Sequence, residues 1–276
     1  MNTLYVTDLD GTLLNSNDRI SQYSIETING LVAKGMQFTY ATARSLVSAS
    51  VVAKGLSTNI PIIAYNGVLI MNPNTGEVLS FLSFTEEETA YAIGVLREHG
   101  GNPLVYAYVD GAERVSYVTG RENEGIRRYL DVRKGDRRFR PLADETCLYQ
   151  GDIFYFTCIA DREELLPLYE IFSQDRRFRT TLQQELYRPE YFLEIMPQKA
   201  SKAEAIKRLK EIWHCDKVVS FGDAINDIPM FEISDECYAV ANAVPELKAY
   251  ATGVIASNDE DGVAKWLEQN GEVFCG

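Results

Sequence analysis

The sequence predicts an α/β protein in which a doubly wound, mostly parallel sheet is interrupted by one inserted α+β module. Apolar runs typical of buried strands alternate with helical segments at the start of the chain and again in its last third. Such alternation indicates a parallel sheet covered by helices. The middle differs: residues 84–189 hold 14 Arg and one Lys, whereas the rest holds three Arg and nine Lys. We therefore expect a discontinuous core of residues 1–83 and 190–276 and an inserted domain of residues 84–189.

The opening segments predict a βαβαβ unit. Ser21 and Ser45 are expected to cap its two helices, and Gly35 is expected to end the first. Parallel strands need helical crossovers of this kind, so the strands should lie in one parallel sheet. A turn at Asn66-Gly67 then leads into two short strands. The expected elements, in chain order, cover residues 3–7, 21–34, 36–41, 45–54, 60–65, 68–71 and 77–81.

The middle of the chain predicts an antiparallel α+β module. Thr85 and Glu88 form a capping box for a helix that ends at Gly100. The basic runs at 133–140 and 176–179 are expected to be solvated loops, because the chain as a whole is acidic. The other expected elements are two strands flanking Asp110-Gly111, a helix at 122–130, a strand at 152–160 and a helix opening at Asp161.

The last third returns to alternating strands and helices, which is why we assign it to the core. Ser201 is expected to be a plain helix N-cap, and Pro245 is expected at the start of another helix. The expected elements are a strand at 191–196, a helix from Ser201, a strand at 217–221, a short helix after Asn226 and a strand at 237–241.

The composition excludes several kinds of partner. The formal net charge of −13 disfavours nucleic acid and anionic membranes, although a bound cation can reverse the potential inside one cleft. No apolar stretch is long enough to span a bilayer, and no signal peptide is evident. Five separate cysteines without a CxxC pair suggest neither zinc nor disulfides, and hence a reduced, cytoplasmic location. They are Cys147, Cys158, Cys215, Cys237 and Cys275.

Two carboxylates stand at the end of the first predicted strand. Asp8 and Asp10 are two residues apart, so on a strand their side chains would point the same way. Gly11 allows a sharp turn, and Thr12 adds a backbone donor and a hydroxyl. Two like charges this close require either a proton or a cation between them. An ordinary Asp-rich turn would explain the pair if it stood alone.

Three distant segments favour a shared site. Thr42 and Arg44 follow the second strand, Lys202 opens a helix, and the segment 222–227 follows the strand at 217–221 with Asp223, Asn226 and Asp227. In an open parallel sheet, ligands bind beyond the carboxyl ends of the strands, so these groups should converge there. Four carboxylates suit a hard cation such as Mg²⁺, and the remaining Thr, Asn and Lys groups suit phosphate oxygens. A carboxylate can also attack phosphorus, so the residues predict phosphoryl transfer.

These motifs resemble those of a known family. Asp8-x-Asp10-Gly11-Thr12, Thr42, Lys202 and Gly222-Asp223-x-x-Asn226-Asp227 are similar to the four ordered motifs of the haloacid dehalogenase superfamily, and more narrowly of its Cof-like sugar-phosphatase branch. Ala43 and Ala224 stand where this branch usually has glycine. The resemblance covers the whole chain, more weakly from 84 to 189. It implies a Rossmann-like core with a mobile α/β cap over the active site.

The resemblance also implies the role of each residue. Asp8 would be the nucleophile, and Asp10 the general acid and base. Lys202 would neutralise charge on Asp8 and the phosphoryl group. The implied metal ligands are Asp8, Asp10 through its carbonyl, Asp223 and Asp227, the last directly or through water. The implied phosphate-binding residues are Thr42 and Asn226, with Gly11 and Thr12.

Four residues have competing interpretations. Asp227 could cap the helix that follows it, and Lys199 competes with Lys202 for the phosphate. Arg44 either contacts substrate or forms a salt bridge near the helix start. Asn66 is a possible substrate contact, although the turn alone explains it.

The expected function is a Mg²⁺-dependent phosphatase, a phosphoric monoester hydrolase that acts on small phosphorylated metabolites such as sugar phosphates through an aspartyl-phosphate. The alternatives are a phosphomutase of the same superfamily and a non-catalytic sugar-phosphate binding protein. We expect a monomer or a weak homo-oligomer.

Overall fold

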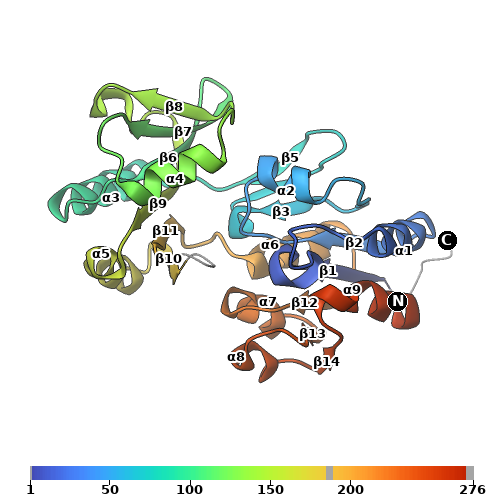
Figure 1. Cartoon of the computed structure of the whole chain (residues 1–276). Helices are drawn as coiled ribbons and strands as arrows, with labels where there is room; N and C mark the ends of the chain where they lie inside the picture. The colour runs from blue at the N-terminus through green and yellow to red at the C-terminus, as the bar shows by residue number, and fades with distance from the viewer. Residues whose placement is uncertain (1, 185–188, 272–276) are drawn as a thin grey trace. The chain divides into compact units, whose positions relative to one another are not determined.

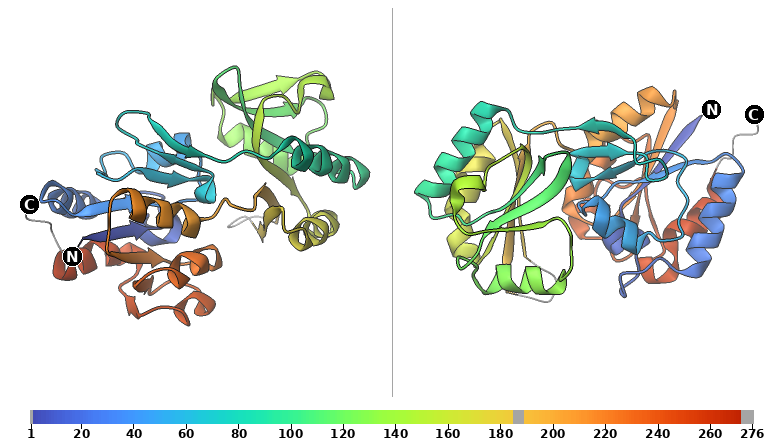
Figure 2. Two further views of the ribbon diagram at one scale, coloured as in Figure 1. Left: turned by 180° about the vertical axis from the view of Figure 1, so that it is seen from behind. Right: turned by 90° about the horizontal axis from the view of Figure 1, so that it is seen from above.

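The computed structural model describes residues 2–184 and 189–271, so Cys275 lies outside the described residues. The chain divides into two compact units, one of Met1–Phe81 with Ala200–Gly276 and one of Leu82–Lys199. The ribbon in Figures 1 and 2 shows both units as mixtures of helices and strands. Within residues 2–184 and 189–271, no helix has the length and apolar character needed to cross a bilayer.

The first unit is built on a five-stranded parallel sheet with strand order β14-β13-β12-β1-β2. Strand β1 lies between β12 and β2, so it joins the start of the chain to its last third. The strands are β1 (Thr3–Thr7), β2 (Gln37–Tyr40), β12 (Lys217–Gly222), β13 (Glu236–Val240) and β14 (Gly253–Ile255). Nearly every residue of β1 and β12 is buried, as expected of central parallel strands.

Helices cover both faces of this sheet. The chain runs from β1 to β2 on one side and from β12 to β13 on the other, so right-handed crossovers place α1 and α7 on opposite faces. Helix α1 packs on α9, and α6 packs on α7. The doubly wound α/β class predicted from the sequence is therefore confirmed. The helices are α1 (Gln22–Ala33), α2 (Leu46–Val52), α6 (Lys202–Ile212), α7 (Ile228–Glu232), α8 (Pro245–Lys248) and α9 (Gly262–Asn270).

A small antiparallel sheet extends this unit. It has the order β3-β4-β5, with β3 (Ile62–Ala64), β4 (Leu69–Met71) and β5 (Val78–Phe81). A parallel bridge between Ala41 and Ile63 links it to the end of β2. The strand expected at 60–65 is therefore present but short.

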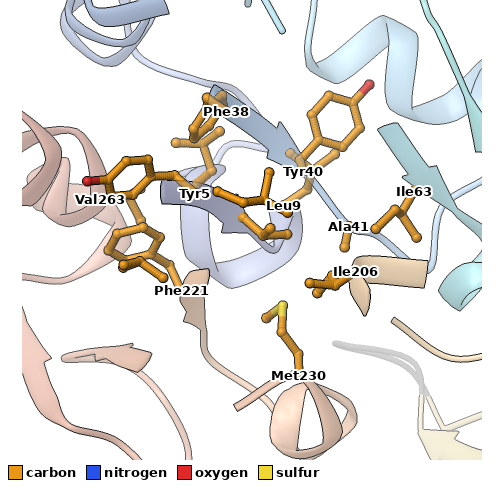
Figure 3. Packing of buried hydrophobic residues seen from close by; sticks show 14 of the residues in the cluster. Tyr5, Leu9, Phe38, Tyr40, Ala41, Ile63, Ile206, Phe221, Met230 and Val263 are labelled. Atoms are coloured by element: carbon orange, nitrogen blue, oxygen red, sulfur yellow. The ribbon is translucent and has the colours of Figure 1, made fainter. Parts of the chain in front are cut away.

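One apolar cluster holds the first unit together. Figure 3 shows side chains from strands and helices on both faces of the parallel sheet. Phe221 packs edge-on against Trp266 with ring centroids 5.2 Å apart, which fixes α9 against β12. Six of the residues labelled in Figure 3 come from six different elements: Tyr5, Phe38, Ile206, Phe221, Met230 and Val263.

The second unit is a six-stranded sheet in the order β10-β11-β9-β6-β7-β8, antiparallel except for β7 with β8. Leu193 and Ile195 face a core formed with α3 and α5, whereas Phe192 contacts Tyr129 of α4, so α4 lies on the opposite face. The strands are β6 (Leu104–Val109), β7 (Ala112–Val118), β8 (Phe139–Leu142), β9 (Asp152–Ala160), β10 (Phe178–Gln184) and β11 (Tyr191–Pro197). The helices are α3 (Glu86–Glu98), α4 (Glu124–Val132) and α5 (Arg162–Gln174).

The two basic runs differ from expectation. Strands β8 and β10 begin within or beside them, and Arg138 is buried rather than solvated. Its guanidinium forms ion pairs with Glu113 at 2.7 Å and Asp136 at 2.6 Å. Carboxylates from the preceding turn and from β7 neutralise Arg138 and allow its burial. The density of basic residues in the sequence therefore did not predict correctly that this run would be a solvated loop.

The strand expected at 191–196 also has an unexpected position. Strand β11 pairs with β10 and β9 on its two sides and so belongs to the sheet of the second unit. The second unit extends to Lys199, whereas the inserted domain was expected to end at residue 189. An apolar run does not reveal whether its neighbours are parallel or antiparallel, so periodicity could not assign it to a sheet.

We predict that Gly67→Ala destabilises the protein much more than Gly76→Ala. Both glycines have positive φ, at 103° and 76°, so either alanine costs about 1 kcal/mol in backbone strain. A Cβ at Gly67 would also collide with the backbone of Ser201, whereas nothing lies within 4 Å of one at Gly76. Urea denaturation should give a loss of about 3 kcal/mol or more for Gly67→Ala. Equal losses would contradict this close approach.

Candidate functional site

The site begins where β1 ends. Asp8 follows the last strand residue in an extended conformation, and the chain then makes a tight turn over Leu9–Leu13. Gly11 lies in this turn with φ of 69°, and a Cβ there would collide with the carboxylate of Asp223. The turn therefore brings the backbone directly against a residue more than two hundred positions away, which only glycine permits.

Lys202 joins the start and the end of the chain. Its ammonium lies 2.5 Å from Asp8 Oδ1 and 2.7 Å from Asp227 Oδ1, and its side chain is only 2% exposed. Lys202 is the first residue of α6, after Ser201, whose hydroxyl accepts a hydrogen bond from Glu204 N as expected of an N-cap. Lys199, its competitor in the sequence, is exposed.

The loop after β12 supplies two further carboxylates. Asp227 Oδ2 accepts hydrogen bonds from the backbone amides of Asp223 at 3.1 Å and Ala224 at 3.2 Å. Asp227 thus stabilises its own turn through one oxygen and binds Lys202 through the other. Asp223 Oδ1 accepts a hydrogen bond from the Thr12 hydroxyl at 3.1 Å.

Three of these carboxylates could hold a metal ion. Oxygens of Asp8, Asp223 and Asp227 all lie within 4.8 Å of one another, in a buried to partly buried setting. The donors are all oxygens, which suits a hard divalent cation. Within the described residues, Asp8 Oδ2 and Asp223 Oδ2 receive no hydrogen bond and so are available as ligands. The residues present therefore fit a divalent ion.

Asp10 does not join this group through its side chain. Arg44 Nε lies 2.9 Å from each Asp10 carboxylate oxygen, and Arg44 Nη2 lies 2.5 Å from Oδ1. A second carboxylate, Asp18, lies 3.2 Å from the same guanidinium. The Asp10 side chain is 44% exposed. The expectation that Asp8 and Asp10 project side by side needs correction, since β1 ends at Thr7 and each carboxylate takes a different cation.

The phosphate-binding candidates lie on neighbouring loops of the same unit. Thr42 is fully buried, and its hydroxyl accepts a hydrogen bond from Arg44 N at 3.0 Å. Asn66 is buried with φ of 53°, and its backbone N–H donates a hydrogen bond to the Thr42 carbonyl at 2.9 Å. Asn66 therefore supports the Thr42 loop through its backbone. Asn226 is partly exposed in the short turn Ile225–Asp227.

Burial and charge crowding shift the acidities of this cluster. Burial raises the pKa of Asp8 well above its usual value, and Asp227 and Asp223 raise it further against the opposing effect of Lys202. Burial, followed by Asp227, raises the pKa of Asp223 to about 7. Burial lowers the pKa of Lys202, but Asp227 and Asp8 outweigh burial, so the net pKa lies above the usual lysine value. Lys202 alone therefore does not compensate the negative charge of these carboxylates.

Counting charges leads to the same conclusion. When ionised, Asp8, Asp223 and Asp227 carry three negative charges against the one positive charge of Lys202, since Arg44 is paired with Asp10 and Asp18. Two negative charges remain uncompensated, which one divalent cation would neutralise.

The structure brings most of the sequence-predicted residues into this neighbourhood and adds two. Asn242 donates from Nδ2 to the Gly11 carbonyl at 2.7 Å, and Asp18 binds Arg44. Asn242 follows the end of β13, so its place just beyond a strand of the parallel sheet was a signal that could have found it. Asp18 follows no motif, and its contribution depends on a loop conformation with φ of 55°.

The fold and the site together define a doubly wound α/β core with an acidic cluster that could hold a metal ion. The haloacid dehalogenase-like hydrolase family matches residues 5–267. The chain belongs to this family, which confirms the resemblance inferred from its motifs, and it is an enzyme of the hydrolase class.

Named relatives resemble the chain over nearly its whole length. The 5-amino-6-(5-phospho-D-ribitylamino)uracil phosphatase YwtE of Bacillus subtilis is 26% identical, over 95% of this chain and 96% of its own. YitU of the same organism, which has the same descriptive name, is 23% identical over 96% of both.

Solved structures share the architecture. That of TM0651 from Thermotoga maritima gives a TM-score of 0.78 at 28% identity and covers 98% of this chain and 97% of its own. A haloacid dehalogenase-like hydrolase from Bacteroides thetaiotaomicron gives 0.79 at 25% identity, covering 98% of this chain and 99% of its own.

We predict that, without divalent cation, Asp223 destabilises the fold as pH rises. Its folded pKa of about 7 lies above the usual unfolded value near 4, so folding favours the protonated form. Its contribution should therefore be lost between about pH 4 and pH 7, by about 2 kcal/mol after allowance for its partial exposure.

Asp223→Asn supplies the matched control. In chelator, the variant should gain stability relative to the native chain as pH rises from 4 to 8, measured by urea denaturation at each pH. Added Mg²⁺ should reverse the trend. A stability difference that does not change with pH would contradict the assigned environment of Asp223.

Proposed function

We propose that this enzyme, a phosphatase of the haloacid dehalogenase-like family, is Mg²⁺-dependent and hydrolyses small phosphorylated metabolites through an aspartyl-phosphate on Asp8. The observation that carries the proposal is the buried group of Asp8, Lys202 and Asp227 with Asp223 beside it. Structural carboxylates are rarely buried in such number around one lysine, because the desolvation cost is large. Such clusters are typical of functional sites.

Asp8 and Asp223 would hold Mg²⁺ directly, each through the oxygen that no described residue occupies. Asp227 already accepts three hydrogen bonds, from Lys202 and two amides, which favours contact through water. The Asp10 carbonyl is the remaining candidate ligand. When bound, the ion would supply positive charge to the phosphate oxygens and to the carboxylates.

In the first step, an oxygen of Asp8 attacks phosphorus in line, and the bond from phosphorus to the ester oxygen breaks. Asp10 gives its proton to the departing oxygen. Thr42, Asn226 and the turn at Gly11 and Thr12 hold the other phosphate oxygens. Lys202 opposes the effect of burial on Asp8 and orients its carboxylate, because the ammonium binds Asp8 Oδ1.

In the second step, Asp10 takes a proton from water, whose oxygen attacks phosphorus and releases Asp8 as a carboxylate. This step needs the carboxylate form of Asp10, which the structure shows paired with Arg44. The first step needs protonated Asp10, so we expect Arg44 to leave Asp10 when it can bind substrate phosphate instead.

The substrate class rests on chemistry and on relatives. The site offers groups for one phosphate monoester and a hard cation, and the two named relatives carry the name of a phosphatase for a phosphorylated ribityl compound. This supports a small phosphorylated metabolite, with sugar phosphates and related polyol phosphates as the first candidates. Localisation in the cytoplasm is consistent with such substrates.

We predict that Asp8→Asn abolishes turnover, because the amide cannot attack phosphorus. The measurement is release of inorganic phosphate from 4-nitrophenyl phosphate and from a panel of sugar and polyol phosphates, with Mg²⁺ and with chelator. Asp152→Asn, an exposed carboxylate of the second unit, is the matched control and should retain full activity. Activity that persists in Asp8→Asn would overturn the nucleophile, and an isomeric sugar phosphate in place of free phosphate would indicate a mutase.

We predict a different failure for Asp10→Asn. With an alkyl phosphate, kcat should fall by about 10²–10⁴-fold, because the leaving oxygen lacks its proton donor. With 4-nitrophenyl phosphate, whose leaving group needs no proton, a rapid burst of 4-nitrophenolate matching the enzyme concentration should precede slow turnover. Rapid-mixing absorbance measures the burst; equal losses on both substrates without a burst would contradict the two-step role.

A further inference from the structure

A cavity lies beneath α2, on the side of the first unit formed by β2, β4 and the loop after β4. Its volume is about 320 Å³, which falls in the range of small-molecule sites in proteins. None of the proposed metal-binding, catalytic or phosphate-binding residues contributes to its lining. Tyr40 contributes from the last position of β2, two residues before Thr42.

The lining of this cavity is uncharged. Its walls are mainly apolar, with Leu46 and Val47 from α2, Leu56, Met71 and Pro73, and no described Asp, Glu, Lys or Arg contributes to them. The neutral polar groups come from Tyr40, Ser50, Thr58 and Asn74. A phosphorylated substrate would find no counter-charge here, so the cavity does not extend the phosphate site.

Tyr40 is one of the residues that line this cavity. The residue is 4% exposed, and among the described residues its hydroxyl forms no hydrogen bond that affects its pKa. Burial raises the pKa of Tyr40 to about 12 with no contribution from any hydrogen bond. Figure 3 shows the ring extending from β2 with its oxygen pointing away from Leu9 and Ala41. Buried tyrosine hydroxyls normally find a partner.

A second hydroxyl lies at the same place. Thr58 is buried, and within the described residues its Oγ1 has no hydrogen-bond partner. Its carbonyl, in contrast, accepts a hydrogen bond from Asn74 Nδ2 at 3.4 Å. Of the two hydroxyls, that of Tyr40 is the one that a ligand in the cavity can bond to, because the Thr58 hydroxyl has almost no accessible surface.

We propose that this cavity is a second ligand site, which takes an uncharged small molecule with an apolar body and one hydrogen-bonding group. The apolar walls would cover the body, and the Tyr40 hydroxyl would bind the polar group. Helix α2 is suited to adapt to such a ligand, because only Ala49 of its seven residues is fully buried. The site is independent of the phosphatase chemistry.

Binding of benzamide to the full chain, monitored by NMR of methionine ¹³C-methyl groups, tests this site. Met71 lines the cavity, whereas Met36 and Met230 are buried in the core cluster and serve as internal controls. We expect titration to shift the Met71 signal with a Kd on the order of 1 mM, and Met36 and Met230 to stay unchanged. Benzoate, which has nearly the same shape but a charge, should not shift it.

Two variants assign the binding to the cavity. Tyr40→Phe keeps the ring and removes the hydroxyl, so the Kd for benzamide should rise about fivefold to tenfold. Ser50→Leu narrows the cavity from an exposed position and should weaken binding as well. Tyr250→Phe, at a half-exposed tyrosine outside the cavity, is the matched control and should not change the Kd.

Three results would overturn the proposal. They are no shift at Met71 with about 10 mM benzamide, equal shifts with benzoate, and a Kd unchanged by both Tyr40→Phe and Ser50→Leu in protein whose unfolding transition is native-like. Each would identify the cavity as a hydrated recess without selectivity.

Discussion

A buried lysine between two aspartates is the interaction on which the site depends. Lys202 joins the end of β1, the start of α6 and the turn after β12, three segments that are far apart in sequence. Removing one partner of such a buried group costs about 3–5 kcal/mol, because a charge is left uncompensated. The same ammonium binds one oxygen of Asp8 and leaves the other free. Stability and orientation of the carboxylate thus have a single cause.

The parallel sheet is what makes this meeting possible. Strands β1, β12 and β2 are neighbours and run in the same direction, so their carboxyl ends lie at one edge. Two close backbone approaches then tighten the edge: Gly11 against Asp223, and Gly67 against Ser201. A side chain at either glycine would separate the loops that carry the charged groups. The strand order brings these loops to one edge of the sheet, and the two glycines allow the loops to approach each other closely.

The sequence predicted features that depend on local patterns, but it did not predict features that depend on partners distant in the chain. Strand β1, the N-caps Ser21 and Ser45 and the capping box at Thr85 depend on local patterns, and all are present. Strand β11 was assigned to the wrong sheet, because sheet membership depends on partners distant in sequence. The same limit hid the buried Arg138 and the Asp18 contact to Arg44. The cavity beneath α2 had no sequence signal, since ordinary apolar residues form it.

Two aspartates of one short motif have distinct surroundings, which is what a two-step phosphoryl transfer requires. Asp8 is buried and bound to an ammonium in the interior, whereas Asp10 is half-exposed and bound to a guanidinium that also binds Asp18. A nucleophile must stay ionised and fixed, and an acid–base group must exchange protons with substrate and water. Different environments can assign different roles to identical side chains. The turn that begins at Leu9 separates them: β1 ends at Thr7, before either aspartate, so their side chains need not share a face.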